Sequence, residues 1–300
     1  MRRVLLSGSG GFLGRSLREH LRRDGVEIAS IGIGPAHHPF HFAVEAGGWT
    51  RDSWAEALER TQPDTVFHLA GIVRGDEDEI RRVNTTLALD LTAALRMTGF
   101  RPTLVVAGSA AEYGEAVIDG LPVAEDAVCA PVTPYGQTKL AQTRAALAFG
   151  AEGQCRVVVA RIFNPIGPGM PGHLALADFA RQIAGFERSG AILRTGDLDV
   201  CRDFLDVADV AQALIALAGN PAAQGVVNIC SGVPTSLRGL VESMIAASGK
   251  RIEIVIDPAR LRPGERRIVI GSPERLAGLA ALAPPRDLHR RAADILMALH

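Results

Sequence analysis

The chain has 300 residues, of which 47% are hydrophobic and 22% are charged, and its formal net charge is −1. A globular protein has this composition, and the near-neutral charge excludes a nucleic acid or a membrane surface as the main expected partner. The first apolar run, at positions 4–6, is too short for a signal peptide, and no apolar stretch approaches the roughly 20 residues of a membrane span.

The four cysteines are scattered without paired spacing, which favours free thiols in a reducing, cytoplasmic location. Three histidines, His37, His38 and His41, gather in one loop, but no carboxylate or cysteine cluster accompanies them. Zinc and similar ions need three or four such ligands together. The sequence therefore predicts a polar loop here and no metal site.

The chain opens with a short apolar run that ends in a glycine-rich turn, and a helical pattern of leucines follows. Strand, glycine turn and helix form the context of a dinucleotide-binding loop. Gly8 is expected to allow the tight turn, Gly11 to let a pyrophosphate approach the backbone, and Gly14 to let the helix pack on the strand. Phe12 and Leu13 then stand at the helix start, where free N–H groups face the phosphates.

The second predicted strand, Val26 to Ile31, lacks the acidic residue that often binds the adenosine ribose at this point. The sequence continues Ile31-Gly32-Ile33-Gly34, with neither an acid nor an arginine. It therefore leaves the choice between NAD and NADP open.

The next segments repeat the alternation of helix and strand. A helix is predicted from Asp52 to Arg60, a strand from Thr65 to Leu69, and a long helix from Glu79 to Met97. Asn84 lies inside the long helix, either as a structural polar residue or close to the cofactor. A buried strand, Thr103 to Ala107, follows and leads to Ser109. Because ligands bind beyond the carboxyl ends of parallel strands, Ser109 is either a catalytic hydroxyl or a turn serine.

Tyr135 and Lys139 follow Pro134 at the start of an alanine-rich amphipathic run, which predicts the first turns of a helix. Residues four apart share one helix face, so the phenol and the ammonium lie side by side. A nearby cation favours phenolate and is expected to lower the pKa of Tyr135 from about 10, as a general acid or base near neutral pH requires. The alternative is a helix surface that carries an aromatic residue.

Five or more repeats of strand and helix predict an α/β fold with a Rossmann-like, doubly wound parallel sheet. We assign residues 1–169 to a dinucleotide-binding domain with the candidate Ser/Tyr/Lys residues. Residues 170–300 form a smaller C-terminal α/β lobe for substrate, which returns at least one strand to the main sheet. The boundary is soft because no low-complexity linker marks it.

Taken in order, these motifs resemble the extended short-chain dehydrogenase/reductase family, the NAD-dependent epimerase/dehydratases, in its nucleotide-sugar branch. The resemblance covers nearly the whole chain. It rests on Gly8-x-x-Gly11-x-x-Gly14, His68-Leu69-Ala70-Gly71, Ser109 with Tyr113-Gly114, Tyr135-x-x-x-Lys139, Arg161-x-Phe163-Asn164-x-x-Gly167-Pro168, Arg202-Asp203-Phe204 and Asn228-x-x-Ser231-Gly232. It implies that Leu69, Ala70 and Gly71 also bind the cofactor, NAD or NADP, together with Asn84, Tyr135 and Lys139.

Two stretches narrow the resemblance to GDP-sugar enzymes of deoxysugar biosynthesis. Residues 196–204 are similar to the segment that grips the diphosphate in GDP-mannose 4,6-dehydratases and GDP-4-keto-6-deoxymannose reductases. Residues 260–265 are similar to their Arg-Pro-x-Glu segment. An arginine fork can clamp phosphate and a glutamate can accept ribose hydroxyls, so Arg202, Arg262 and Glu265 are expected to hold the nucleotide. Surface salt bridges are the alternative for the two arginines.

The same resemblance separates reduction from dehydration. Dehydratases carry an acid pair just after the Ser/Thr, where this chain has Ala110 and Ala111, and alanine cannot transfer a proton. Glu112 is one position late and should point elsewhere. Reductases often keep one glutamate in that place, so Ala111 departs from them as well.

The resemblance therefore implies an NAD(P)H-dependent reduction of the C4 ketone of a nucleotide-linked 4-keto-6-deoxy sugar. Tyr135 would donate the proton, Lys139 would assist it and bond the nicotinamide ribose, Ser109 would orient the carbonyl, and Asn164 would hold the sugar or phosphate. A nucleotide-sugar 4-epimerase with tightly bound NAD is the alternative, and a non-catalytic cofactor-binding protein is a third possibility. The resemblance also implies a homodimer.

Overall fold

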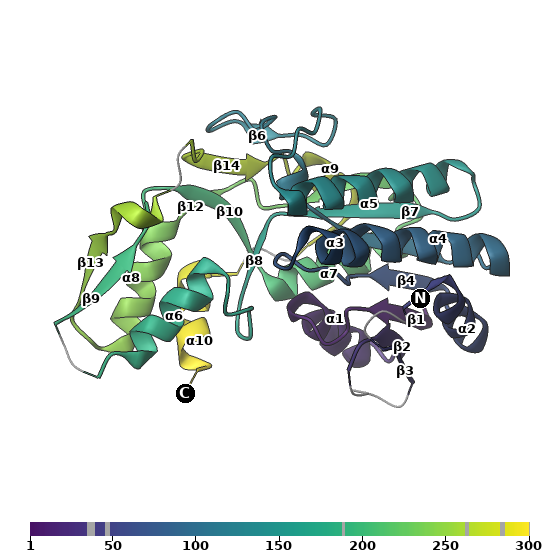
Figure 1. The fold of residues 1–300 in the computed structure, drawn as a ribbon, viewed down its shortest axis with the longest axis horizontal. Helices are drawn as coiled ribbons and strands as arrows, with labels where there is room; N and C mark the ends of the chain where they lie inside the picture. The colour runs from purple at the N-terminus through teal and green to yellow at the C-terminus, as the bar shows by residue number, and fades with distance from the viewer. Residues whose placement is uncertain (35–39, 46–48, 188–189, 262–263, 283–285, 300) are drawn as a thin grey trace.

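The structure is a computed structural model that describes residues 1–34, 40–45, 49–187, 190–261, 264–282 and 286–299. It has two unequal lobes, and the larger one is built on a seven-stranded sheet (Figure 1). The strand order is β11-β7-β5-β4-β1-β2-β3, and every neighbouring pair is parallel. The bounds are β1 (Arg3–Ser7), β2 (Glu27–Gly32), β3 (His41–Ala43), β4 (Thr65–His68), β5 (Thr103–Ser109), β7 (Val157–Ile162) and β11 (Gly225–Ile229).

Helices cover both faces of this sheet, and successive strand residues serve opposite faces. Leu6 and Phe67 point to the core under α1 (Phe12–Arg23), α7 (Val207–Gly219) and α9 (Glu274–Leu279). Leu5 and Val66 point to the core under α2 (Arg51–Thr61), α4 (Leu87–Thr98) and α5 (Pro134–Ala151). All four side chains are fully buried, and each contributes roughly 1.5–3 kcal/mol through burial. Strands buried on both faces are therefore continuous apolar runs in the sequence.

The smaller lobe packs three helices against a two-stranded parallel ribbon. The helices are α6 (Ala175–Gly185), α8 (Leu237–Ser248) and α10 (Leu288–Met297), and the ribbon pairs β9 (Ala191–Thr195) with β13 (Ile252–Ile256). Its own apolar core includes Phe179, Leu240 and Ile295. Among the described residues no helix is both long and apolar enough to cross a lipid bilayer.

A second small sheet joins the lobes. Its strand order is β12-β10-β14-β6, with β8 paired to β10. The bounds are β6 (Pro122–Val123), β8 (Asn164–Ile166), β10 (Cys201–Asp206), β12 (Pro234–Ser236) and β14 (Ile268–Gly271). Tyr113, Phe163 and Cys230 pack beneath it, so the segment after β5 touches residues far along the chain. This sheet brings the candidate nucleotide residues of β10 toward the large lobe.

The predicted fold class is confirmed, and the predicted return of a strand is confirmed by β11, which pairs with β7. The division at residue 169 stays a prediction. The long helix predicted from Glu79 to Met97 is interrupted: α3 (Glu77–Arg81) leads into a π-helical turn, η1 (Arg82–Thr86), before α4 begins. The loop after β2 contains β3, a strand of three residues that is too short to show a pattern in the sequence.

Candidate active site

The glycine-rich turn joins β1 to α1 at the carboxyl edge of the large sheet. Gly8 has φ +71°, and a Cβ there would lie 2.8 Å from the amide nitrogen of Ala70 in the turn after β4. A Cβ at Gly14 would lie 2.0 Å from the carbonyl oxygen of Gly8, and one at Gly11 would lie 3.2 Å from it. Any side chain at Gly8 or Gly14 would push backbone away from backbone. The turn therefore has the close packing that the sequence predicted, while cofactor binding by these glycines stays a prediction.

The start of α1 suits an anionic ligand. Its N-cap Gly11 makes no side-chain hydrogen bond, and the first turn holds no acidic residue, so no carboxylate competes at the positive end of the helix. The side chain of Phe12 lies near Gly167, and the side chain of Leu13 packs on the core. These two residues could therefore contact a phosphate only through their backbone N–H groups. The residues present therefore fit the pyrophosphate of a dinucleotide.

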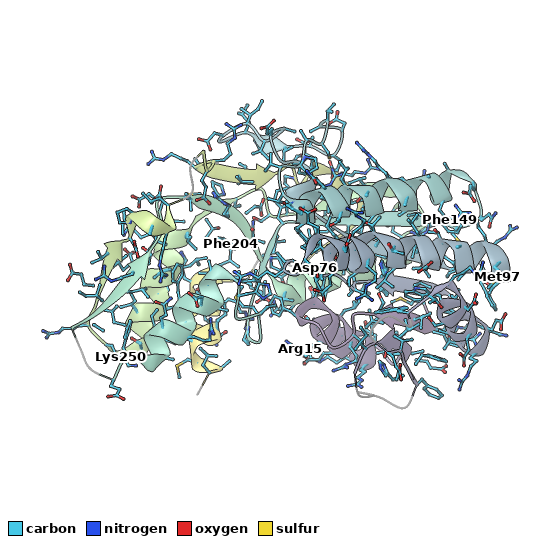
Figure 2. The ribbon with its side chains drawn as sticks, in the orientation of Figure 1. Arg15, Asp76, Met97, Phe149, Phe204 and Lys250 are labelled. Carbon is cyan, nitrogen blue, oxygen red and sulfur yellow. The ribbon has the colours of Figure 1, made fainter. Side chains whose placement is uncertain are left out.

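Arg15 connects this turn to the segment between the lobes (Figure 2). Its guanidinium donates to the carbonyl oxygens of Gly10, at 2.7 Å, and Gly169, at 2.8 Å. The glycine-rich turn is thereby connected to the chain that leads into the smaller lobe.

Ser7 fixes the turn after β4. Its Oγ accepts the backbone N–H groups of Leu69 and Ala70, each at 3.2 Å, and lies 2.9 Å from Nδ1 of His68. Because this oxygen already accepts twice, we assign its own hydrogen to Nδ1 and the imidazole proton to Nε2. Burial, and secondly the charge of Lys139, lower the pKa of His68 to about 3, so the imidazole is neutral.

Asn84 links the same turn to α5 from within η1. Its Oδ1 accepts the N–H of Ile72 at 2.8 Å, and its Nδ2 donates to the Ile72 carbonyl at 2.9 Å and to Thr138 Oγ1 at 3.1 Å. Both amide protons are therefore committed inside the protein. These contacts support the structural alternative for Asn84, and a contact with the cofactor stays a prediction. Single π turns are frequent at functional sites.

Ser109 and Tyr135 meet where β5 ends and α5 begins, close enough for the Ser109 hydroxyl to lower the pKa of the phenol. Thr133 caps α5 by accepting the N–H of Gly136 at 3.0 Å. A Cβ at Gly136 would lie 2.5 Å from the carbonyl oxygen of Ala111, so only glycine lets the first turn of α5 lie against the turn after Ser109. The sequence explains the pairing: a helix that starts with proline and has a glycine in its first turn can approach the strand end closely.

Lys139 lies one helical turn beyond Tyr135 and is 3% exposed. Its Nζ donates to Gln142 Oε1 at 3.0 Å, and Gln142 Nε2 donates to the Ala107 carbonyl at 2.9 Å. A Cβ at Gly71 would lie 3.8 Å from this ammonium, so Lys139 faces the turn after β4. Burial lowers the pKa of Lys139 to about 8, and the charge of Glu112 opposes that shift.

The expectation that the pKa of Tyr135 is lowered is wrong. Burial raises the pKa of Tyr135 above its ordinary value, the hydrogen bond with Ser109 lowers it, and the charge of Glu112 raises it. Burial has the largest effect because a phenolate loses more on leaving water than the Ser109 hydroxyl returns. At neutral pH the phenol is therefore protonated and can donate a proton.

Among the expected substrate residues, the structure brings Arg202 and Glu265 together. Nη2 of Arg202 lies 2.7 Å from Oε1 of Glu265, and the two side chains are 17% and 26% exposed. Asn164, at the start of β8, donates through Nδ2 to the Asp203 carbonyl at 2.9 Å. Arg262 lies outside the described residues. A salt bridge was the alternative for Arg202, and nucleotide binding by these residues stays a prediction.

Asp203 organises the joint between the lobes, a role that sequence reasoning missed. Its carboxylate accepts the N–H and hydroxyl of Ser231, both at 2.7 Å, and the N–H groups of Gly232 at 2.9 Å and Gly271 at 3.1 Å. The sequence feature that could have revealed this role is an acidic residue inside a strand, because a buried carboxylate needs several hydrogen-bond donors.

Sequence reasoning also left Glu112 and Arg161 without a role. Glu112 ends a short 3-10 turn, η2 (Ala110–Glu112), and is fully buried. Its Oε2 lies 3.0 Å from Nη2 of Arg161 on β7. The available signal was Arg161 itself, since a charged residue in an otherwise apolar strand needs a buried partner.

Comparisons with known proteins agree with this geometry. The chain is 35% identical to GDP-6-deoxy-D-mannose reductase of Pseudomonas aeruginosa, over 91% of this chain and 89% of that protein. It is 34% identical to dTDP-6-deoxy-L-talose 4-dehydrogenase (NAD(P)(+)) of Kitasatospora kifunensis, over 86% of this chain and 82% of that protein. The solved structure of RMD from Pseudomonas aeruginosa complexed with NADPH superposes with a TM-score of 0.85 at 32% identity, covering 99% of this chain and 98% of that one.

The match to a family model spans most of the large lobe and the joint. Residues 4–230 fit the model, so the match includes the glycine turn of α1, the Ser109–Tyr135–Lys139 cluster and β11. With those elements placed together at one edge of a parallel sheet, the chain belongs to the NAD dependent epimerase/dehydratase family.

Proposed function

We propose that the protein uses NAD(P)H to reduce the C4 ketone of a nucleotide-linked 4-keto-6-deoxy sugar, with a GDP-linked sugar favoured. The observation that carries the proposal is the placement of Ser109 beside Tyr135, with Lys139 one turn away and facing the turn after β4. The relatives named above are a GDP-6-deoxy-D-mannose reductase and a dTDP-6-deoxy-L-talose 4-dehydrogenase (NAD(P)(+)).

Each member of the cluster has a separate task. When bound, the reduced nicotinamide supplies a hydride to the carbonyl carbon. Tyr135, which burial keeps protonated, donates its proton to the oxygen of the developing alkoxide. Ser109 donates a hydrogen bond to the same oxygen and stabilises its charge. Lys139 keeps a positive charge beside Tyr135 and stabilises the phenolate that remains.

The residues next to Ser109 argue against dehydration. Ala110 and Ala111 occupy the positions of the acid pair of the dehydratases, and neither can transfer a proton. The carbonyl of Ala111 instead lies against the first turn of α5. Arg202 and Glu265, with Arg262, are proposed to hold the nucleotide diphosphate, because the pair in the structure presents both a guanidinium and a carboxylate at a partly exposed position.

A 4-epimerase is the second candidate. It is supported by the family to which the chain belongs, which includes epimerases. The same Ser109, Tyr135 and Lys139 can oxidise C4 and reduce it again if the cofactor stays bound through the cycle. An epimerase would be isolated with NAD attached, and its turnover would cause no net change in cofactor.

The test is an assay of cofactor consumption with 4-keto-6-deoxy sugars linked to GDP, dTDP, UDP and CDP, each with NADH and NADPH. We expect one reduced cofactor to be oxidised for each sugar reduced, with the highest kcat/KM for a GDP sugar. Product without net oxidation would instead establish the epimerase. The absence of product from every sugar would leave only a non-catalytic cofactor-binding protein.

We also propose that the protein is a homodimer paired through α4 and α5. Leu89 and Met97 lie two turns apart on α4 and are 47% and 54% exposed, and Met97 lies at the outer end of that helix (Figure 2). Ala141 and Ala148 are exposed on the neighbouring helix α5. Leu89→Arg should shift the sedimenting species from dimer to monomer, whereas Ile192→Arg, on the smaller lobe, should not. A wild-type protein that sediments as a monomer would contradict the pairing.

A cytoplasmic location is part of the proposal. Its support is the four cysteines, all of which are free thiols in the structure, as a reducing compartment keeps them. Cell fractionation should place the reductase activity in the soluble fraction, and activity in another compartment would contradict it.

A further inference from the structure

A buried carboxylate lies directly behind the catalytic serine. Glu112 is fully buried, and its Oε1 accepts the backbone N–H of Ser109 at 2.8 Å. In return the Ser109 hydroxyl accepts the N–H of Ala111 at 3.2 Å, so side chain and backbone of the serine are both tied to the turn that follows it. A Cβ at Gly108 would lie 2.8 Å from Oε1, so the carboxylate fits here only because the residue before the serine is glycine.

Arg161 holds this carboxylate from the next strand. Its Nε and Nη2 both donate to Oε2 of Glu112, at 3.1 and 3.0 Å, which is a planar fork on a single oxygen. Arg161 pairs in register with Gly108, so the sheet places it beside the end of β5. Its guanidinium also lies 4.4 Å above the ring of Tyr113, whose hydroxyl donates to Asn228 Oδ1 at 2.7 Å. Contacts from β5, β7 and β11 therefore fix the ion pair of Glu112 and Arg161.

The negative charge of Glu112 acts on Tyr135 and Lys139, although its oxygens are hydrogen-bonded to Ser109 and Arg161. Burial has the largest effect on both Tyr135 and Lys139, raising the pKa of the phenol and lowering that of the ammonium. Glu112 acts on both in one direction, since a negative charge raises each pKa. The ionisable groups around it are Arg161, Tyr113, Tyr135, Lys139 and Cys129.

We propose that Glu112, clamped by Arg161, is a positioning residue of the reaction: it fixes the Ser109 peptide so that the hydroxyl faces Tyr135, and its negative charge acts on Tyr135 and Lys139. This proposal rests on the proposed function. Glu112 contacts neither substrate nor cofactor in this scheme; it acts through Ser109 and through space. A misplacement of the serine by a fraction of an ångström is enough to slow the chemical step without changing the binding surfaces.

Two substitutions separate position from charge. Glu112→Gln keeps an oxygen for the Ser109 N–H but removes the charge. Glu112→Asp keeps the charge, but a side chain one methylene shorter cannot serve Ser109 and Arg161 together. Because Glu112→Gln leaves Arg161 without a counter-ion, the double variant Glu112→Gln/Arg161→Met is prepared as well, so that no unpaired charge is buried. Glu152→Gln, in the exposed pair with Arg96, is the matched control.

The experiment measures kcat, KM and NADPH affinity against pH with a GDP-linked 4-keto-6-deoxy sugar. For Glu112→Gln and the double variant we expect kcat to fall about 10- to 100-fold, with KM and NADPH affinity unchanged within about two-fold. The alkaline limb of kcat should move toward lower pH in these variants, since Lys139 loses a favourable charge. For Glu112→Asp kcat should fall while that limb stays in place. Glu152→Gln should match the wild type.

Four results would overturn the proposal. If the Glu112→Gln variant or the double variant folds and keeps the wild-type kcat and pH profile, the carboxylate is not needed. A loss of NADPH and sugar binding in parallel with kcat would show a merely structural role. Failure of both variants to fold would do the same. A wild-type protein that reduces no 4-keto sugar nucleotide would overturn the proposed function, and this device with it, whereas an active wild type beside unchanged variants would overturn this proposal alone.

Discussion

Replacing Lys139 by methionine is predicted to stabilise the protein at neutral pH while removing its activity. Burial lowers the pKa of this lysine from 10.5 to about 8. The difference of about 2.5 units, at about 1.36 kcal/mol per unit, corresponds to roughly 3 kcal/mol that opposes folding when the ammonium is charged. Methionine has a similar length and no charge. Loss of the hydrogen bond to Gln142 offsets about 1 kcal/mol, so the net gain is roughly 2 kcal/mol.

The pH dependence follows from the sign of the shift. The folded pKa is below the unfolded one, so between about pH 8 and 10.5 the unfolded chain binds more protons, and this group's contribution to stability rises with pH. The advantage of the variant is therefore largest at neutral pH and shrinks through that window. The raised pKa values of Tyr113, about 12, and Cys155, about 11, act in the opposite direction. Both proteins contain these groups, so their effects cancel in the difference.

Urea unfolding of both proteins at pH values below and within that window measures the difference. Lys250→Met, at the only other lysine of the chain, is the control. Its Nζ donates to the Ile183 and Ala184 carbonyls at the end of α6, so that variant should lose stability. A Lys139→Met protein that is less stable than the wild type at neutral pH, or an advantage that does not change with pH, would refute the reasoning.

Three further predictions concern single residues. Tyr135→Phe should lower kcat at least about 100-fold with little change in NADPH affinity, measured by titration, because only the proton donor is removed; a fully active variant removes the tyrosine from this role. Gly14→Ala, whose Cβ would lie 2.0 Å from the Gly8 carbonyl oxygen, should cost roughly 2 kcal/mol or more in thermal unfolding and abolish NADPH binding. Gly219→Ala, with nothing within 4 Å of its Cβ, should do neither, and equal effects of the two would contradict the packing argument. Because the pKa of His68 is lowered to about 3, the unfolded chain binds more protons than the folded protein between pH 3 and about 6.5. The free energy of unfolding of the wild type should therefore fall by up to roughly 4–5 kcal/mol as the pH drops through that window. The His68→Asn variant should show a shallower fall.

Much of the site could be predicted from the sequence because its parts depend on local patterns. A glycine turn between an apolar strand and a helix predicts the closely packed turn between β1 and α1, and a proline-started helix with Tyr135 and Lys139 four apart predicts that these two side chains share one face of α5. Ser109 follows an apolar strand, and parallel strands end at one edge. Those rules require no knowledge of distant contacts, which is why the predicted family and fold class are confirmed.

The remaining features depend on contacts between distant segments. The spacing of Tyr135 and Lys139 showed their proximity but not their burial, and burial decides the direction of both pKa shifts. Glu112 was set aside because its buried partner, Arg161, lies 49 positions away in the sequence. The strands of the joint, such as β6 with two residues, are too short for a hydrophobic period and form only where β10 and β14 meet them.

The most direct test of the central claim follows the hydride. The wild-type protein is incubated with a GDP-linked 4-keto-6-deoxy sugar and NADPH that carries deuterium in both positions at C4 of the nicotinamide, and the product is analysed by NMR. We predict deuterium at C4 of the sugar, with one NADP formed for each product molecule. A product that carries no deuterium at C4, formed without net oxidation of NADPH, would contradict the account.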